Sequence, residues 1–129
     1  MPVTYRIDRA RGLIHTTCTG MVTLQDVLEH FAVLMQDPNR SHGLDVLLDL
    51  TQIASIPTSE ELRIVTSEIA QIRPAIEFGR CAVAASREAM YGMMRMFEVY
   101  AEGYFTDVQA FRTIEEAASW LGPTPRMPR

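Results

Sequence analysis

Two short apolar runs constrain the fold of this chain more than any other feature of its sequence. Residues 44–50 read Leu-Asp-Val-Leu-Leu-Asp-Leu, and residues 81–85 read Cys-Ala-Val-Ala-Ala. Runs of this kind carry hydrophobic side chains at odd and even positions, which suits strands that are covered on both faces. Such strands are typical of parallel sheets, whose neighbouring strands need long, usually helical connections.

The segments between these runs predict helices. The apolar side chains of residues 58–76 recur in steps of three and four, so they form one face of a helix. They are Leu62, Val65, Ile69, Ile72 and Ile76. Helices are also expected over residues 23–35, 86–104 and 113–121. The residues expected to cap the four helices are Thr23, Ser86 and the capping boxes Thr58–Glu61 and Thr113–Glu116.

The N-terminal residues predict a β-hairpin. Residues 3–8 alternate between polar and apolar side chains, residues 9–12 suit a turn, and residues 13–20 are rich in β-branched side chains. A short last strand is expected at residues 108–111. The predicted order is β-β-α-β-α-β-α-β-α, so we expect an α/β fold with a mixed, mostly parallel five-stranded sheet, four helices and right-handed crossovers.

Length and composition indicate one globular domain. The chain has 129 residues, of which 47% are hydrophobic and 22% charged, and this size suffices to bury a core without disulfides or metals. We therefore expect residues 1–122 to form a single domain. The three prolines of residues 123–129 predict a flexible tail.

Charge and hydropathy argue against several kinds of partner. The net charge of −4 is unlike that of nucleic-acid-binding proteins, which need a basic surface. All 12 basic residues are Arg, which excludes lysine Schiff bases and P-loop lysines. No apolar stretch reaches the roughly 18 residues of a membrane span, and residues 1–11 do not resemble a signal peptide. We expect a cytoplasmic protein without stable membrane association.

The sequence carries no motif for a metal or a cofactor. His15, His30 and His42 lack the His-x-x-x-His or Glu-x-x-His spacing of metal sites, and the dispersed glycines form no phosphate-binding loop. Ser41, His42 and Asp45 contain the letters of a catalytic triad. Triads are spatial arrangements, however, and this segment is expected to be a loop.

The two cysteines are expected to be buried free thiols, because Cys18 and Cys81 both lie in apolar, strand-like runs. His15 and Cys18 are three residues apart on a predicted strand, so their side chains should point to opposite faces of the sheet. This spacing argues against a Cys–His nucleophile pair between them.

Three segments carry a resemblance to a known family. Residues 20–26 read Gly-x-Val-Thr-Leu-x-Asp, residues 47–51 read Leu-Leu-Asp-Leu-Thr, and residues 111–121 close with Phe-Arg-Thr-Ile-Glu-Glu-Ala-Ala-Ser-Trp-Leu. With the N-terminal hairpin, residues 2–121 resemble the STAS domain, and more closely the SpoIIAA-like family of small bacterial proteins. The resemblance implies a non-enzymatic interaction or regulatory module. The SpoIIAA-like fold is also similar to the lipid-binding Sec14 type.

The resemblance also implies a candidate regulatory position. In STAS-type anti-anti-sigma factors, phosphorylation of a Ser in an Asp-Ser-Ser-Gly stretch blocks binding to a partner kinase. Ser59 falls at that position, but Pro57 replaces the Asp and Glu60 replaces the Gly. A phosphate on Ser59 would also be repelled by the carboxylates of Glu60 and Glu61. Thr58 and Ser59 are therefore candidate positions within a broken phospho-switch motif, and helix capping is the alternative role of Thr58.

A second candidate site lies at the carboxyl ends of the predicted parallel strands, where open α/β sheets bind ligands. The candidate ligand rim consists of Asp49, Thr51, Ser86 and Arg87. In the alternative interpretation, Asp49 binds loop amides and Ser86 caps a helix, which leaves no site there.

The third candidate is a helix rich in methionine and aromatic side chains. Soft methionine side chains recur at adaptable binding surfaces. This helix could therefore pack into the core, form a homodimer contact or line a pocket for an apolar ligand. The residues concerned are Met90, Met93, Met94, Phe97, Tyr100 and Tyr104.

Three functions remain open from the sequence. The first is a non-enzymatic protein-binding module that self-associates as a homodimer. The second is a carrier of a small apolar or lipid-like ligand. The third is an enzyme built on Asp49, Ser59 and Ser86, which the sequence supports least because no activated nucleophile or acid–base pair is evident.

Overall fold

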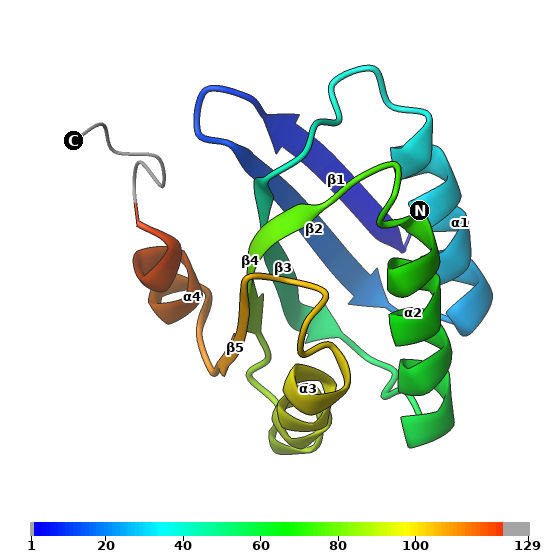
Figure 1. Cartoon of the computed structure of the whole chain (residues 1–129). Coiled ribbons are helices and arrows are strands. Elements are labelled where there is room, and N and C mark those ends of the chain that lie inside the picture. The colour runs from blue at the N-terminus through cyan, green and yellow to red at the C-terminus, as the bar shows by residue number, and fades with distance from the viewer. Residues whose placement is uncertain (1, 123–129) are drawn as a thin grey trace.

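The computed structural model of the chain describes residues 2–122 (Figure 1). The flexible tail predicted for residues 123–129 lies outside these residues. The elements follow the predicted order. Their bounds are β1 (Val3–Asp8), β2 (Leu13–Gly20), α1 (Leu24–Met35), β3 (Leu44–Ile53), α2 (Ser59–Ile72), β4 (Phe78–Ala84), α3 (Glu88–Tyr100), β5 (Asp107–Phe111) and α4 (Ile114–Leu121).

The five strands form one sheet in the order β1-β2-β3-β4-β5. β1 and β2 are antiparallel, with Val3 opposite Cys18, and the other three neighbouring pairs are parallel. The predicted α/β class, with a mostly parallel sheet and an N-terminal hairpin, is confirmed. The two apolar runs form β3 and β4. Both strands are longer than predicted, because β3 continues to Ile53 and β4 begins at Phe78.

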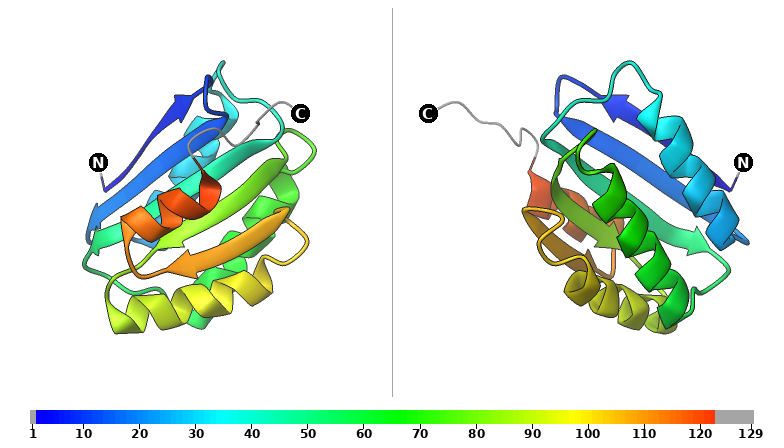
Figure 2. Two further views of the ribbon diagram at one scale, coloured as in Figure 1. Left: turned by 90° about the vertical axis from the view of Figure 1, so that its left-hand side faces the viewer. Right: turned by 45° about the vertical axis from the view of Figure 1, so that its right-hand side comes forward.

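The helices are divided unequally between the two faces of the sheet (Figure 2). α1, α2 and α3 lie on one face, whereas α4 lies on the other, against β3, β4 and β5. Each of α1, α2 and α3 connects two parallel strands that are neighbours in the sheet. Crossover connections between parallel strands are almost always right-handed. Because each new strand is added on the same side of the sheet, all three connecting helices lie on the same face.

Three of the four predicted helix caps are present. The Thr58 hydroxyl accepts a hydrogen bond from the N–H of Glu61, and the Glu61 carboxylate accepts one from the N–H of Thr58, which completes a capping box. Thr23 takes part in the same reciprocal arrangement at the start of α1. Thr113 accepts from the N–H of Glu116, which is one half of the predicted box.

The prediction that Ser86 caps the third helix is wrong. α3 begins at Glu88 and is preceded by Arg87, whose backbone is extended and whose side chain makes no capping hydrogen bond. The Arg87 guanidinium donates instead to the carbonyl groups of Ile53 and Ala54. Ser86 lies one residue too early to reach the first amides of the helix.

α3 is also shorter than predicted. It ends at Tyr100, and Gly103, with a φ of +93°, turns the chain so that Tyr104 lies beyond the helix. Both tyrosines pack against the main core. The guanidinium carbons of Arg63 and Arg73 lie 5.3 Å and 5.8 Å from the ring centres of Tyr100 and Tyr104, which links this region to α2.

The main hydrophobic core lies between the sheet and the layer of α1, α2 and α3, and a smaller core lies under α4. Cys18 and Cys81 are buried free thiols in the main core, as predicted. Within residues 2–122, no helix is long and apolar enough to cross a membrane.

A buried ion pair joins the beginnings of β3 and β4. Asp45 is 1% exposed, and its Oδ1 and Oδ2 accept hydrogen bonds from the Arg80 amide at 2.7 Å and the Arg80 Nη2 at 2.9 Å. The same guanidinium donates to the carbonyl groups of Trp120 and Leu121. These carbonyls belong to the last turn of α4, where they have no partner within the helix. The Arg80 side chain therefore adds a polar connection between the sheet and the C-terminal helix.

Gly79 is required by this ion pair. A Cβ atom at position 79 would collide with the carboxylate of Asp45 and lie 3.0 Å from the carbonyl oxygen of Gly43. Gly92 is the opposite case, because it is exposed within α3 and an added Cβ atom would have nothing within 4 Å.

We predict opposite effects of adding one methyl group at these two glycines. Gly79→Ala should lower the free energy of unfolding by roughly 1–3 kcal/mol, because the buried carboxylate or the strand must move. Gly92→Ala should raise it by about 0.5–1 kcal/mol, because alanine loses less backbone entropy in a helix. Urea denaturation measures both changes. If the Gly79→Ala variant had the same free energy of unfolding as the wild type, the rigid placement of Asp45 would be contradicted.

Candidate functional site

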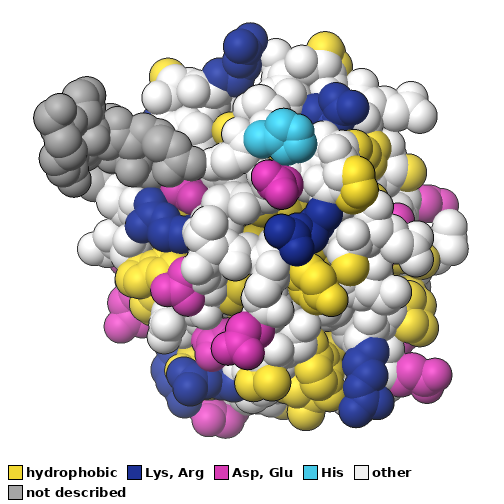
Figure 3. Space-filling model, viewed as in Figure 1, with side chains coloured by type: hydrophobic (Ala, Val, Ile, Leu, Met, Phe, Trp, Pro, Cys, Tyr) yellow, Lys and Arg dark blue, Asp and Glu magenta, His cyan; other side chains and the backbone are white. Residues whose placement is uncertain are grey.

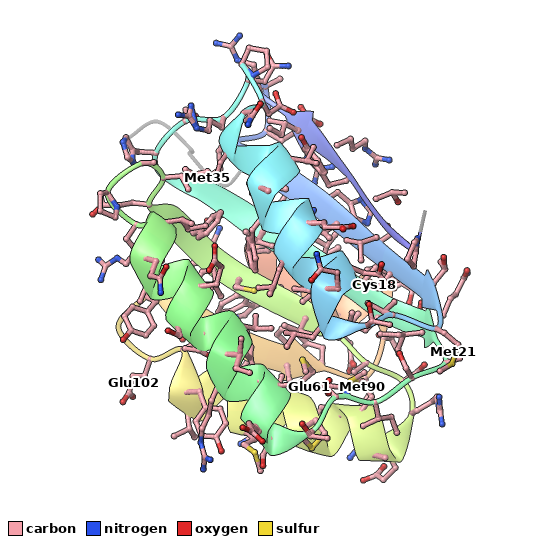
Figure 4. The ribbon with its side chains drawn as sticks, turned by 90° about the vertical axis from the view of Figure 1, so that its right-hand side faces the viewer. Cys18, Met21, Met35, Glu61, Met90 and Glu102 are labelled. Carbon is pink, nitrogen blue, oxygen red and sulfur yellow. The ribbon has the colours of Figure 1, made fainter. Side chains whose placement is uncertain are left out.

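An apolar cavity of about 180 Å³ lies between α1, α2 and the sheet. Figure 4 looks onto these two helices and labels Cys18 of β2 in the sheet behind them, Glu61 of α2 and Met90 of α3. Nearly all lining side chains are hydrophobic. The deeper ones include Ile14, Val46, Leu48, Leu50, Leu62, Ile69, Phe78, Met90, Met94 and Phe97.

The cavity exists because α1 is incompletely seated on the sheet. Only Leu34 of this helix is fully buried, at 2% exposed. Leu24, Val27 and Phe31 are half-buried, and all three line the cavity. The apolar face of α1 therefore borders an open space along part of its length.

The N-termini of α1 and α2 flank one end of the cavity, next to the carboxyl ends of β2 and β3. Here the Ser55 hydroxyl accepts a hydrogen bond from the Val22 amide and donates one to the Val22 carbonyl, both at 2.9 Å. These bonds tie together the two loops that lead into the helices. Ile56, Pro57 and Glu61 complete this end of the lining.

Besides the cysteine thiols, Glu61 and His30 are the ionisable side chains of the lining. Burial raises the pKa of the Cys18 thiol to about 11 and that of Cys81 to about 12, and the nearby carboxylates of Asp49 and Asp45 raise these pKa values further. Both thiols are protonated at neutral pH, and the Glu61 carboxylate is engaged in helix capping. This environment suits the binding of an apolar molecule more than nucleophilic chemistry.

His30 of α1 stands against two aromatic rings. Its ring centre lies 5.3 Å from that of Tyr5 and 5.5 Å from that of Phe31. Burial lowers the pKa of His30 to about 4, so the imidazole is neutral at physiological pH. The Tyr5 hydroxyl donates a 2.6 Å hydrogen bond to Asp37, and burial together with this bond raises the pKa of Tyr5 to about 12.

The residues of the predicted ligand rim lie at the carboxyl ends of the neighbouring strands β3 and β4. The Asp49 carboxylate accepts hydrogen bonds from the amide and the hydroxyl of Thr51 at 2.9 Å and 2.7 Å. Leu48 and Leu50 face the cavity, so Asp49, by strand alternation, faces the α4 side of the sheet. Ser86 and Arg87 are exposed before α3. Whether the four residues bind a ligand remains a prediction.

Thr58 and Ser59 lie at the N-terminus of α2. Thr58 is the N-cap, and Ser59 is the first residue of the helix and is half-buried. Glu60 and Glu61 are in the same first turn, as expected from the sequence. Ser59 and Thr58 remain candidate regulatory positions within a broken phospho-switch motif.

The methionine-rich helix divides between two environments. Met90, Met94 and Phe97 are buried and line the cavity. Met93, Tyr100 and Tyr104 are partly buried and pack against the core outside the cavity. Half of the predicted set is therefore one wall of the cavity.

His15 lies on the opposite face from the cavity, next to Arg6 and Asp49, whereas Cys18 faces the cavity. This confirms that the two side chains diverge. Among the described residues, no group of three His, Cys, Asp or Glu side chains could hold a metal ion.

Sequence reasoning missed α1 as a wall of the site and the polar residues Thr16 and His30 in its lining. One signal was available: Val27, His30 and Leu34 follow one another in steps of three and four, so His30 shares a helix face with two apolar residues. The sequence of α1 is that of an ordinary amphipathic helix, so it does not show that most of its apolar side chains are only half-buried.

No protein-family model matches the chain, and no curated protein matches it. Among solved structures, the chain is similar to an uncharacterised protein of the DUF3478 family from Shewanella loihica PV-4, which has a SpoIIAA-like fold. The two share 15% sequence identity with a TM-score of 0.63, over 92% of this chain and 93% of that one. The chain has a SpoIIAA-like fold. The predicted resemblance is thus confirmed for the fold, and a SpoIIAA-like fold can hold an apolar cavity under its first two helices.

The buried imidazole of His30 predicts a pH dependence of stability. Between pH 6.5 and pH 4 the unfolded chain binds a proton at this position that the folded chain does not bind, so stability decreases as the pH falls. Relative to a His30→Phe variant, the wild-type protein should lose up to about 2 kcal/mol of unfolding free energy between pH 7 and pH 5.

Urea denaturation at the two pH values measures this difference. A His42→Gln variant, altered at an exposed loop position, controls for the general effect of removing a histidine. If wild-type and His30→Phe proteins lost equal stability, His30 would not be buried as described.

Proposed function

We propose that this protein is a non-enzymatic binding protein for a small apolar molecule, which it holds between α1, α2 and the sheet. The observation that carries the proposal is the apolar cavity of about 180 Å³. Protein interiors are packed as densely as organic crystals, and they contain few voids larger than a water molecule. A hollow of this size, lined almost entirely by hydrophobic side chains, is typical of a ligand site.

The size of the cavity indicates the size of the ligand. An engineered cavity of about 150 Å³ lined by Leu, Ile and Phe stays dry and binds benzene. The cavity of this protein is comparable, so it suits a molecule with a single ring or a short acyl chain. The half-seated helix α1 offers a route of entry, because its displacement breaks few buried contacts.

The chemistry of the lining supports binding without catalysis. The thiols are protonated, the carboxylate at the mouth caps a helix, and His30 faces two aromatic rings instead of a nucleophile. The solved SpoIIAA-like neighbour is itself uncharacterised, so it supports the fold and names no ligand.

Self-association as a homodimer, binding of a protein partner and a cytoplasmic location remain predictions. On the face shown in Figure 3, hydrophobic side chains form small groups between charged ones. The large exposed hydrophobic residues include Val33, Ile64, Met96 and Val99, which are distributed over α1, α2 and α3.

Filling the cavity should abolish binding. In a Val65→Phe variant, the larger ring occupies the space beside α2, so the affinity for ethylbenzene should fall by at least about tenfold. The free energy of unfolding should rise by roughly 1 kcal/mol, because the added ring buries apolar surface in a space that is otherwise unfilled. Calorimetric titration and urea denaturation measure the two effects.

Ile64→Phe is the matched control, because Ile64 is adjacent in the sequence, 40% exposed and outside the lining. It should leave affinity and stability nearly unchanged. Native and denaturing mass spectrometry of protein purified from its host should then reveal a retained apolar compound. If Val65→Phe instead destabilised the fold by about 1–3 kcal/mol, as in a filled core, the cavity would not exist.

A further inference from the structure

One threonine of β2 places a hydroxyl-bearing side chain in the wall of the cavity. Thr16 lies in the middle of β2, is 4% exposed and lines the cavity. Its cross-strand partners are Tyr5 on β1 and Leu48 on β3, and Ile14 and Cys18 precede and follow it on the same face of the strand. The hydroxyl is therefore surrounded mainly by hydrophobic groups.

Thr16 differs from the other hydroxyl-bearing residues of the lining. The Thr23 hydroxyl caps α1, and the Ser55 hydroxyl makes two hydrogen bonds to Val22. The hydroxyl of Thr16 has no hydrogen-bond partner among the described residues. In a residue that is 4% exposed, a hydroxyl without a protein partner has little access to water, whereas valine has the same shape without a polar group to satisfy. A threonine here is consistent with a partner supplied from the cavity.

The charge of the lining restricts what that partner can be. No lysine or arginine lines the cavity, and its carboxylate, Glu61, lies at the mouth. His30 is neutral at physiological pH and is placed near the same strands by its contact with Tyr5. An anionic group inside the cavity would have no counter-charge, and burying an unpaired ion is strongly unfavourable.

We infer that the ligand is a small neutral molecule with an apolar body and one oxygen function, a hydroxyl or a carbonyl, that pairs with the hydroxyl of Thr16. The threonine hydroxyl can both donate and accept a hydrogen bond, so it fits either oxygen function. This inference rests on the proposed function, because it names the class of ligand for the same cavity.

Three probes of similar shape test the inference. Benzyl alcohol carries a hydroxyl, ethylbenzene replaces that hydroxyl by a methyl group, and phenylacetate carries a carboxylate. Each is titrated calorimetrically into the wild-type protein and into Thr16→Val, Thr16→Ser and Thr17→Val variants. Thr17 neighbours Thr16 on β2 but points to the other face of the sheet, so Thr17→Val is the matched control.

Each probe is compared between protein variants, so the free energy of removing that probe from water is the same in every comparison and cancels. Thr16→Val should weaken benzyl alcohol binding roughly fivefold and leave ethylbenzene unchanged or tighter, because only the alcohol loses a hydrogen bond. Thr16→Ser should restore alcohol binding, and Thr17→Val should behave as wild type. Phenylacetate should bind roughly a hundredfold more weakly than benzyl alcohol, or not measurably. Without ligand, Thr16→Val should raise the thermal midpoint.

The outcomes separate the two proposals. If ethylbenzene binds and Thr16→Val affects both neutral probes equally, the proposed function stands and the inference about the oxygen function is wrong. Tighter binding of phenylacetate than of benzyl alcohol would also overturn the inference. If none of the three probes binds to the wild-type protein, the proposed function fails, and the inference fails with it.

Discussion

The ion pair between Asp45 and Arg80 is the interaction on which the arrangement of the layers depends. It fixes the beginnings of β3 and β4, and it requires a glycine at position 79 because the carboxylate fills the space of a side chain. The same guanidinium binds the last carbonyls of α4 and lies 5.5 Å from the ring centre of Trp120. A buried carboxylate that lost this partner would remain as an uncompensated charge, which is far more destabilising than the loss of an exposed ion pair. On the second face of the sheet, this side chain thus adds a polar link to the smaller hydrophobic core under α4.

The other face is closed less completely, and the difference has a functional meaning. α2 and α3 bury several side chains and are linked by the contact between Arg63 and Tyr100, whereas α1 buries one. The strand order never reverses, so the sheet has no switch point of the kind where many α/β proteins bind ligands. The available space lies instead between the helical layer and the sheet. Such a site favours apolar molecules, which bind by packing against hydrophobic side chains, over charged molecules, which need ionic partners.

The fold could be predicted from the sequence because its signals are local. Continuous apolar runs mark β3 and β4, and Thr23, Thr58 and Thr113 mark helix starts. The failures came from contacts between distant segments. Asp45 and Arg80 are 35 residues apart. The Arg87 guanidinium binds the distant carbonyls of Ile53 and Ala54, and Ser86 does not cap α3. The site was only half predicted: Met90, Met94 and Phe97 are in its wall, but a hydroxyl at Thr16 within a β-branched run looks like ordinary strand composition. Whether such a hydroxyl has a partner depends on tertiary packing.

The order of strands in the sheet has a consequence for how the chain is made. Each strand pairs with the one that precedes it in the sequence, so every new strand finds its template already synthesised. Domains generally fold N-terminal part first during translation, at about 5–20 residues per second, and contacts between nearby segments form fastest. The hairpin can therefore nucleate the sheet on the ribosome and extend it one βα unit at a time. The hydrogen bonds from Arg80 to the last turn of α4 can form only after that helix has been synthesised, so they are expected to be among the last contacts of the domain to form.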